Sequence, residues 1–285
     1  MIKMFTNQDI AEYYDTTQNH YIRWWGLRRH LSLHFGIWDD QTTSFKQALE
    51  NTNRLMSEKC HINANDSVLD AGCGVGGAAL YLAATFGSKV HGITLSQKQA
   101  DFATSESLAR NLADKLSFSV SDFCKTPFPD QSFDVVWACE SVSHAPDKSE
   151  FIREAYRLLK PGGRLILADF FAASTEQRDK RSLVQKWINA WGISSLTPAK
   201  QFAMLLATHG FKVQKVQDYT NQIIKTSRKL YLASLFGSIG SECYNLLYPG
   251  VSRFAKRHYR SGIYQYKALK AELWTYHMIL AIKPG

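Results

Sequence analysis

The sequence has 285 residues, of which 45% are hydrophobic and 13% aromatic, enough to bury a substantial core. Its five cysteines are scattered and show no CxxC spacing, which argues against disulfides or a zinc site and favours a reducing compartment. Because no apolar run reaches about 18 residues and the first residues lack the apolar stretch of a signal peptide, we expect a soluble, cytoplasmic protein.

Aromatic residues are dense ahead of the first predicted strand, with Tyr14, Tyr21, Trp25 and Trp38 among them. Packing is the default explanation for most such rings. Tyrosine and histidine carry polar tips, however, and so much ring surface outside a sheet indicates a lid or pocket wall. We therefore predict that residues 1–62 form a helical, aromatic lid segment with a helix over 45–59, and that Tyr21, Trp25 and Trp38 contact a substrate.

From residue 63 the pattern alternates between strand and helix. Strands are predicted over 67–71, 89–94, 116–121, 133–139, 163–169, 211–219 and 272–283. Helices are predicted over 76–86, 96–112, 147–159, 178–191 and 198–209. This alternation indicates an α/β fold, a doubly wound, mostly parallel seven-stranded Rossmann-like sheet made by residues 63–220 and 271–285.

The first strand runs through Asp70 into a glycine turn, and a helical pattern follows at once. Gly72-x-Gly74-x-x-Gly77 also matches the dinucleotide fingerprint, so the motif alone is weak. A dinucleotide site expects an acidic residue at the end of the second strand, but this strand ends in Thr94 and no acid follows before Asp101. A carboxylate at a strand end suits a nucleoside-type cofactor with an ammonium group and no phosphate, as in S-adenosylmethionine.

Residues 221–270 interrupt the closing β-hairpin and are predicted to form a helical, basic cap in which Tyr231 contacts the substrate. This segment has a net charge of +8, nearly the whole excess of the chain. Its bases are Lys225, Arg228, Lys229, Arg253, Lys256, Arg257, Arg260, Lys267 and Lys270, against the single acid Glu242. Three interpretations stay open: a solvated face, a membrane-surface patch, or a pocket rim that meets an anionic substrate. Nucleic acid is not an expected partner, because no recognised module accompanies the charge.

Four ordered stretches resemble the successive motifs of class I S-adenosylmethionine-dependent methyltransferases. They are VLDAGCG (68–74), DF (122–123), PFPDQSFDVVW (127–137) and REAYRLLKPGG (153–163). GITLSQ (92–97) resembles the second-strand motif of the sterol C24-, tocopherol- and cyclopropane-fatty-acid-type enzymes. HFGIWD (34–39) and ESVSHAPD (140–147) are similar to motifs of the sterol and tocopherol branches. Together these stretches resemble the sterol C24-, tocopherol- and terpenoid C-methyltransferase group. The sequence is therefore identified as a member of this group.

Carried over residue by residue, the resemblance implies a site for S-adenosylmethionine, which leaves as S-adenosylhomocysteine. The carboxylate of Asp70 and the backbone of Gly72 and Gly74 would hold the methionine part. The N-terminal motif adds His34 to the cofactor-binding residues.

The same resemblance places the nucleoside part of the cofactor. Thr94 and Leu95 would line the ribose, with Gln99 nearby. Asp122 would accept a hydrogen bond from the adenine amino group, with Phe123 beside the ring.

Three residues are candidates for catalysis: Glu140, His144 and Tyr14. Glu140 and His144 follow the fourth strand, so they open onto the same edge as Asp70 and could act as a base pair or relay. The structural alternatives are a loop carboxylate that contacts the cofactor and a helix-capping histidine. Tyr14 would stabilise a cation or orient an acceptor. We interpret the other histidines, His20, His91, His209 and His258, as structural or surface groups.

The function expected from these features is C-methylation of a lipophilic isoprenoid, a terpenoid, prenyl diphosphate or sterol-like alkene, through a carbocation. Aromatic faces would stabilise that cation and a base would remove its proton. The alternatives are a methyltransferase of a prenylated phenol or another oxygen or nitrogen acceptor, and a non-enzymatic lipid- or nucleic-acid-binding protein on the same fold. No metal is expected, because no ligand cluster appears. Peripheral membrane contact through the basic cap is left open.

Overall fold

The computed structural model describes residues 4–175, 179–248, 250 and 252–285. Its strands form a seven-stranded sheet in the order β3-β2-β1-β4-β5-β7-β6, in which β7 runs antiparallel to both of its neighbours and the other pairs are parallel. The strands are β1 (Ser67–Ala71), β2 (Lys89–Thr94), β3 (Leu116–Val120), β4 (Phe133–Cys139), β5 (Leu159–Ala172), β6 (Lys212–Asp218) and β7 (Trp274–Ile282). The predicted doubly wound, mostly parallel seven-stranded sheet is thereby confirmed.

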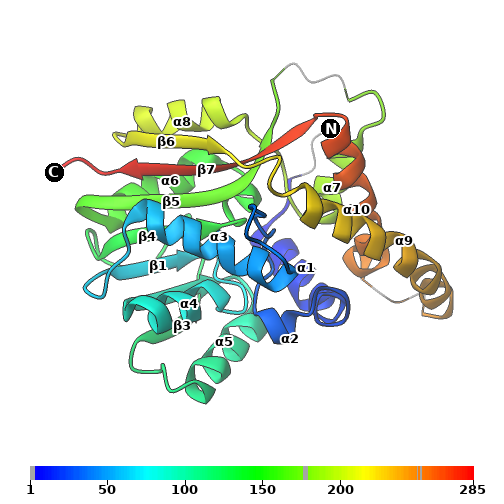
Figure 1. Ribbon diagram of the computed structural model, residues 1–285, viewed down its shortest axis with the longest axis horizontal. Coiled ribbons are helices and arrows are strands. Elements are labelled where there is room, and N and C mark those ends of the chain that lie inside the picture. Colours follow the sequence, from blue (N-terminus) through cyan, green and yellow to red (C-terminus); the bar gives the residue numbers. More distant parts are fainter. Residues whose placement is uncertain (1–3, 176–178, 249, 251) are drawn as a thin grey trace.

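Helices cover both faces of this sheet (Figure 1). One face carries α3 (Phe45–Cys60), α4 (Gly77–Phe86) and α5 (Gln97–Ala109), and the other carries α6 (Lys148–Leu158) and α8 (Ala199–Thr208). Because side chains alternate along a strand, β1 sends Val68 into the core under α3 and α4, and Leu69 into the core under α6 and α8. Both cores are continuous, so the sheet is a rigid support for whatever lies at its edges.

The remaining helices gather beyond the carboxyl ends of the parallel strands (Figure 1). They are α1 (Asn7–His20), the π-helical turn η1 (Tyr21–Trp25), α2 (Leu27–His30), the 3-10 turn η2 (Val142–His144), α7 (Leu183–Ala190), α9 (Ile224–Leu247) and α10 (Arg253–Lys270). Helix α1 begins with a capping box: the Thr6 side chain accepts a hydrogen bond from the Asp9 backbone N–H, and the Asp9 side chain accepts one from the Thr6 backbone N–H. Among the described helices, none is long and apolar enough to cross a membrane.

Two elements differ most from the prediction. The strand expected to begin at residue 163 begins at Leu159, because Leu159 already pairs with Phe133 before the register shifts. The helix expected over 178–191 is shorter and runs from Leu183 to Ala190, and residues 176–178 lie outside the described part of the chain.

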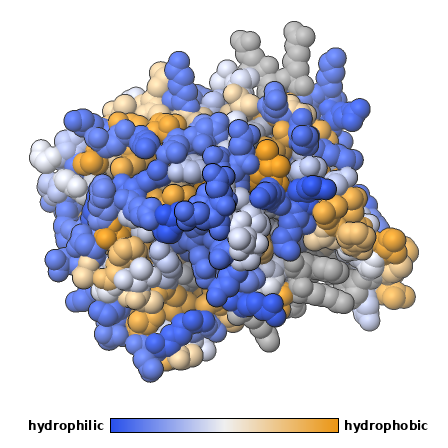
Figure 2. Space-filling view, in the orientation of Figure 1, coloured by the Kyte–Doolittle hydropathy of each residue, from blue (hydrophilic) through white to orange (hydrophobic). Residues whose placement is uncertain are grey.

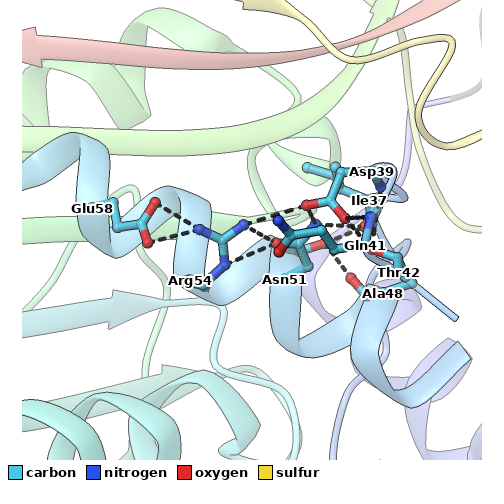
Figure 3. Close-up of polar contacts among 9 residues, drawn as sticks. Ile37, Asp39, Gln41, Thr42, Ala48, Asn51, Arg54 and Glu58 are labelled. Carbon is cyan, nitrogen blue, oxygen red and sulfur yellow. Dashed lines mark hydrogen bonds and ion pairs between the residues drawn. The ribbon is translucent and has the colours of Figure 1, made fainter. Parts of the chain in front are cut away.

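The HFGIWD segment is held against α3 by polar contacts from one face of that helix (Figure 3). Asn51 Nδ2 donates to the backbone oxygen of Ile37 and to the Asp39 carboxylate, at 3.0 Å in each case. Arg54 bridges Glu58, at 2.7 Å, and Asp39, at 3.4 Å. A segment without regular secondary structure is thereby fixed where it meets the end of the sheet.

Candidate active site

A cavity of about 270 Å³ lies at the carboxyl edge of the parallel strands, walled by the N-terminal helices on one side and by α9 and α10 on another. Fourteen of the sixteen predicted site residues line it: Tyr14, Tyr21, Trp25, His34, Asp70, Gly72, Gly74, Thr94, Leu95, Gln99, Asp122, Phe123, Glu140 and His144. These residues come from separate motifs, and the fold brings them to one place.

Trp38 and Tyr231, both predicted to contact the substrate, are not among the residues that line this cavity. Trp38 donates its indole N–H to Thr226 Oγ1 at 3.0 Å, and the ammonium of Lys225 lies 5.1 Å from its ring centre. Tyr231 stacks on Tyr266 with 4.8 Å between ring centres. Both rings serve the packing of the cap, so we assign neither to substrate binding.

Asp70 lies at the end of β1, between Gly92 of β2 and Trp137 of β4. Just after it, Gly72 takes a φ of 88°, and a Cβ there would come within 2.4 Å of the Ser141 side chain. A side chain at this position would both strain the backbone and collide, so the turn requires glycine. The result is a turn without side chains beside the Asp70 carboxylate.

Burial raises the pKa of Asp70 to about 7, with partial compensation from the backbone N–H of Ala79. Within the described residues, Oδ2 of Asp70 is buried without a hydrogen-bond partner, and so is Nε2 of His34, whose Nδ1 lies 3.0 Å from the Phe35 backbone oxygen. Two buried acceptors on one cavity wall favour a ligand that brings donors, and a carboxylate favours a cation. The ammonium group of S-adenosylmethionine fits this part of the site.

Thr94 and Gln99 are joined to each other at the end of β2. Thr94 Oγ1 donates to Oε1 of Gln99 at 2.7 Å and accepts from the Ser96 N–H at 3.2 Å. With its oxygen engaged, the Gln99 amide offers a donor, which suits a ligand hydroxyl at the place where a dinucleotide site would carry an acid.

Asp122 and Phe123 form the next part of the wall. One oxygen of Asp122 accepts from the Cys124 N–H at 2.8 Å, and the other accepts from Asn7 Nδ2 at 2.7 Å. Asn7 is the first residue of α1, so this contact closes the N-terminal helix over the predicted adenine site. The sequence carries no signal for Asn7, because 115 positions separate it from Asp122.

Glu140 joins three parts of the structure that are distant in sequence. It follows β4 with a φ of 52°, and its Oε1 accepts from the Phe35 N–H at 2.6 Å and from the Tyr276 hydroxyl at 2.8 Å. Burial raises the pKa of Glu140 well above its usual value, although these two donors oppose the shift. The Glu140 side chain therefore connects the HFGIWD segment and β7 to β4. The sequence does not indicate that Tyr276 of β7 supplies one of these hydrogen bonds.

His144 and Tyr14 meet inside the cavity. Nε2 of His144 lies 2.9 Å from the Tyr14 hydroxyl, and Nδ1 lies 3.3 Å from the Gly192 backbone oxygen. Because a carbonyl oxygen only accepts, Nδ1 carries the proton, Nε2 is the acceptor and Tyr14 donates to it. Burial lowers the pKa of His144 to about 4, so the imidazole is neutral at physiological pH and keeps a lone pair at the cavity.

A third histidine, His258, lines the cavity beside His34 and His144. Nε2 of His258 is 3.3 Å from the Tyr13 hydroxyl, which lies 2.7 Å from that of Tyr21. The contact with Tyr13 is compatible with the structural role expected for His258, but the sequence does not indicate that this histidine lines the cavity. No local pattern could have revealed it, since 245 positions separate it from Tyr13.

The bases of the cap contribute little charge to the cavity. Of the described lining residues, Lys229 is the one lysine or arginine. Arg253 pairs with Asp9 and Arg260 pairs with Glu242. Within the same part of the chain, no group of three or more His, Cys, Asp or Glu side chains is placed to hold a metal ion.

The sheet order, the glycine turn beside Asp70 and the following Thr94 and Asp122 positions define a class I S-adenosylmethionine-dependent methyltransferase. Residues 69–167 match the model of the methyltransferase domain. Methyltransferase GfsG of Streptomyces halstedii is 30% identical over 76% of this chain and 77% of its own length. The chain therefore belongs to the S-adenosylmethionine-dependent methyltransferase family, and the predicted cofactor is confirmed.

Other relatives match to different extents. The 27-O-demethylrifamycin SV methyltransferase of Amycolatopsis mediterranei is 37% identical over 58% of this chain and 59% of its own length, less than two thirds. The chloroplastic tocopherol O-methyltransferase of Arabidopsis thaliana is 31% identical over 75% of this chain and 66% of its own. The crystal structure of the (4+2)-cyclase SpnF superposes with a TM-score of 0.79 at 24% identity, covering 99% of this chain and 97% of that one, which is a likeness of fold.

Proposed function

We propose that this enzyme methylates a hydroxyl oxygen of a lipophilic small molecule, with His144 receiving the proton that the hydroxyl loses. The observation that carries the proposal is the neutral His144, whose acceptor nitrogen faces the cavity through a single hydrogen bond to Tyr14. An incoming hydroxyl that replaces or joins Tyr14 would find a base in the correct protonation state.

The lining of the cavity supports a lipophilic acceptor. Buried rings of Trp25, Phe35, Phe170 and Trp191 stand on its wall, and Phe35 and Phe170 touch edge to face at 5.3 Å between centres. Such a wall favours an apolar molecule that makes few polar contacts. The names of two relatives are consistent with an oxygen acceptor: one is a 27-O-demethylrifamycin SV methyltransferase and the other a tocopherol O-methyltransferase.

When bound, S-adenosylmethionine supplies the methyl group. The protein holds the two reactants in position, keeps water from the cavity and provides a base. Asp70 and the Gly72–Gly74 backbone would hold the amino-acid end, while Thr94, Gln99, Asp122 and Phe123 would hold the nucleoside. The Leu31 backbone lies directly on the start of α4, so close that a Cβ on Gly77 would collide with its oxygen, and no space is left between the two segments. His144 takes the proton at Nε2 while Gly192 keeps its ring in one orientation.

C-methylation of an isoprenoid alkene is the second candidate, and the aromatic wall is the observation that favours it. Rings around a developing carbocation would stabilise it, and the same Nε2 of His144 would take the proton that restores the double bond. A diphosphate on the acceptor has less support, because Arg253 and Arg260 are paired with acids.

The test is incubation of the purified protein with methyl-labelled S-adenosylmethionine and a matched panel of acceptors. The panel holds prenylated phenols, polycyclic alcohols, sterols, and prenyl diphosphates with their free alcohols. Labelled O–CH₃ products from the phenols or alcohols, lost in His144→Ala with S-adenosylhomocysteine binding retained, are the expected result. Labelled C–CH₃ on an alkene would select the second candidate, and labelling of amines alone would reject both.

A further inference from the structure

Helix α9 has two different faces, one that lines the cavity and one that is exposed and apolar. Residues Leu230, Ala233, Ser234, Gly237 and Ser241 line the cavity, at spacings of three and four that place them on one side of the helix. On the opposite side, the same spacings align Leu232, Leu235, Phe236, Ile239, Leu246 and Leu247, all exposed. In an amphipathic helix of a globular protein the apolar face is normally turned toward the core, whereas in α9 the apolar stripe is turned outward.

The exposed face is large for a protein surface. Phe236 is 80% exposed, Ile239 76%, Leu246 82% and Leu247 74%. Figure 2 shows hydrophobic residues gathered at the projecting end of the molecule, where Figure 1 places α9. Single exposed leucines are ordinary, but a continuous stripe of this kind marks an interaction surface.

The charge around this stripe is positive. Lys225, Arg228 and Lys229 precede it on α9. The helix α10, which packs along α9, adds Lys256, Lys267 and Lys270, whereas its Arg253 and Arg260 pair with Asp9 and Glu242. Glu242 is the one acid of the segment 221–270, and Arg260 pairs with it. An apolar stripe bordered by bases matches an interface that is apolar inside and negatively charged outside.

We propose that α9 is a membrane-docking helix, whose exposed stripe enters the headgroup region of an anionic lipid bilayer while the flanking bases contact lipid phosphates. The helix lies in the plane of the bilayer and does not cross it. Its other face then forms the wall between the bilayer and the cavity.

A second copy of this chain is a poorer occupant of the same surface. A symmetric pair would bring two segments of net charge +8 face to face, and their repulsion would oppose the apolar contact. An anionic bilayer instead gains from the same charge. The apolar character of the stripe and the positive charge around it therefore both favour an anionic lipid bilayer as the partner of this surface.

The experiment is co-sedimentation of the full chain with vesicles of phosphatidylcholine alone or with about 30% phosphatidylglycerol. We expect binding to the anionic vesicles that weakens in about 0.5 M salt, and weak or no binding to the neutral ones. The variant Phe236→Ser/Ile239→Ser is expected to lose about tenfold or more in bound fraction at limiting lipid. Absence of binding to anionic vesicles, or equal binding by that variant, overturns the proposal.

A matched control separates the stripe from general surface hydrophobicity. Leu108→Ser/Met204→Ser removes two apolar side chains that are each 61% exposed, on parts of the chain outside the cap, and is expected to bind as the wild type does. S-adenosylhomocysteine affinity, measured by calorimetry, should be the same in all variants, since none of these four residues lines the cavity. Light scattering completes the set: a dimer that dissociates in Phe236→Ser/Ile239→Ser without vesicle binding in the wild type would assign the stripe to a second copy. The proposal does not depend on the acceptor, so it can fail while the proposed methylation holds.

Discussion

The Tyr14 hydroxyl lies 2.9 Å from Nε2 of His144, although 130 positions separate the two residues in the chain. Their rings are tilted against each other with centres 5.6 Å apart. Since Nδ1 of His144 donates to the Gly192 backbone oxygen, Nε2 carries the lone pair of the imidazole, and the Tyr14 hydroxyl donates a hydrogen bond to it. This relationship joins the N-terminal segment to the loop after β4 and places a base in the cavity.

We predict that His144→Ala lowers kcat by about 10²–10⁴-fold, the range for loss of a general base. Tyr14→Phe removes the hydroxyl but leaves the base, so a decrease of about tenfold or less is expected. Steady-state kinetics with the best acceptor of the panel, alongside S-adenosylhomocysteine calorimetry, measures both. Turnover of His144→Ala close to the wild type would remove His144 from the chemistry.

The lowered pKa of His144 also predicts how stability depends on pH. The unfolded chain takes up a proton on this histidine near its ordinary value of 6.5, while the folded state does so only near 4. This residue therefore costs no stability above pH 6.5, and stability is lost as pH falls from 6.5 to 4, by about 3 kcal/mol in total. Urea unfolding of the wild type and of His144→Gln across this range should show a difference that shrinks toward acid pH. A constant difference would contradict a neutral buried imidazole.

Cofactor binding should release a proton from Asp70. The pKa of the carboxyl is raised to about 7 by burial, and a cation beside it would lower that value. Affinity for S-adenosylhomocysteine is therefore expected to increase with pH up to about 7 and then level off, with about half a proton released at pH 7. Calorimetry in buffers of different ionisation enthalpy measures this release. Asp70→Asn is the control and should bind more weakly without proton release.

Two variants of Glu140 distinguish a structural role of this residue from a role in the chemistry. Glu140→Gln keeps an oxygen that can accept from Phe35 and Tyr276, so the fold should be nearly as stable as the wild type. Glu140→Ala leaves both donors buried without a partner, and we expect a loss of about 2–4 kcal/mol in the free energy of unfolding. If the Gln variant also retains turnover, Glu140 is a positioning residue, whereas stable protein with lost turnover would make its ionisation part of the reaction.

Asn51 and Arg54 offer a comparison between buried and exposed polar contacts on α3 (Figure 3). Asn51 is 7% exposed and satisfies Ile37 and Asp39, so Asn51→Ala should cost about 1–3 kcal/mol in the free energy of unfolding. The Arg54 side chain is 45% exposed, and Arg54→Ala should cost about 1 kcal/mol or less. Urea titrations of both variants give the ranking, and the reverse order would show that the arginine holds the segment.

The parts of this structure that sequence could predict depend on local signals. The run from Val68 to Gly77 predicts a strand, a turn and a helix, because hydrophobic residues, a carboxylate and glycines follow one another within ten positions. Parallel strands then carry Thr94, Asp122 and Glu140 to one edge, so their place on the cavity wall also follows from the topology.

Contacts between distant segments could not be predicted in the same way. Tyr276 reaches Glu140 across 136 positions, and no periodicity in β7 distinguishes it from its neighbours. Composition indicated an aromatic cavity but not which side of each element faces it. This is why Trp25 lines the cavity, whereas Trp38 lies on the surface of the cap.

The long interruption between β6 and β7 has a consequence for biosynthesis. β7 lies between β5 and β6 in the sheet, yet it follows both of them in the chain and is made after α9 and α10. A nascent polypeptide lacking it would expose two unpaired strand edges and leave Glu140 without its Tyr276 donor. The cavity can therefore close only after β7 has been made, and products truncated before β7 are expected to be inactive and recognised by chaperones or proteases.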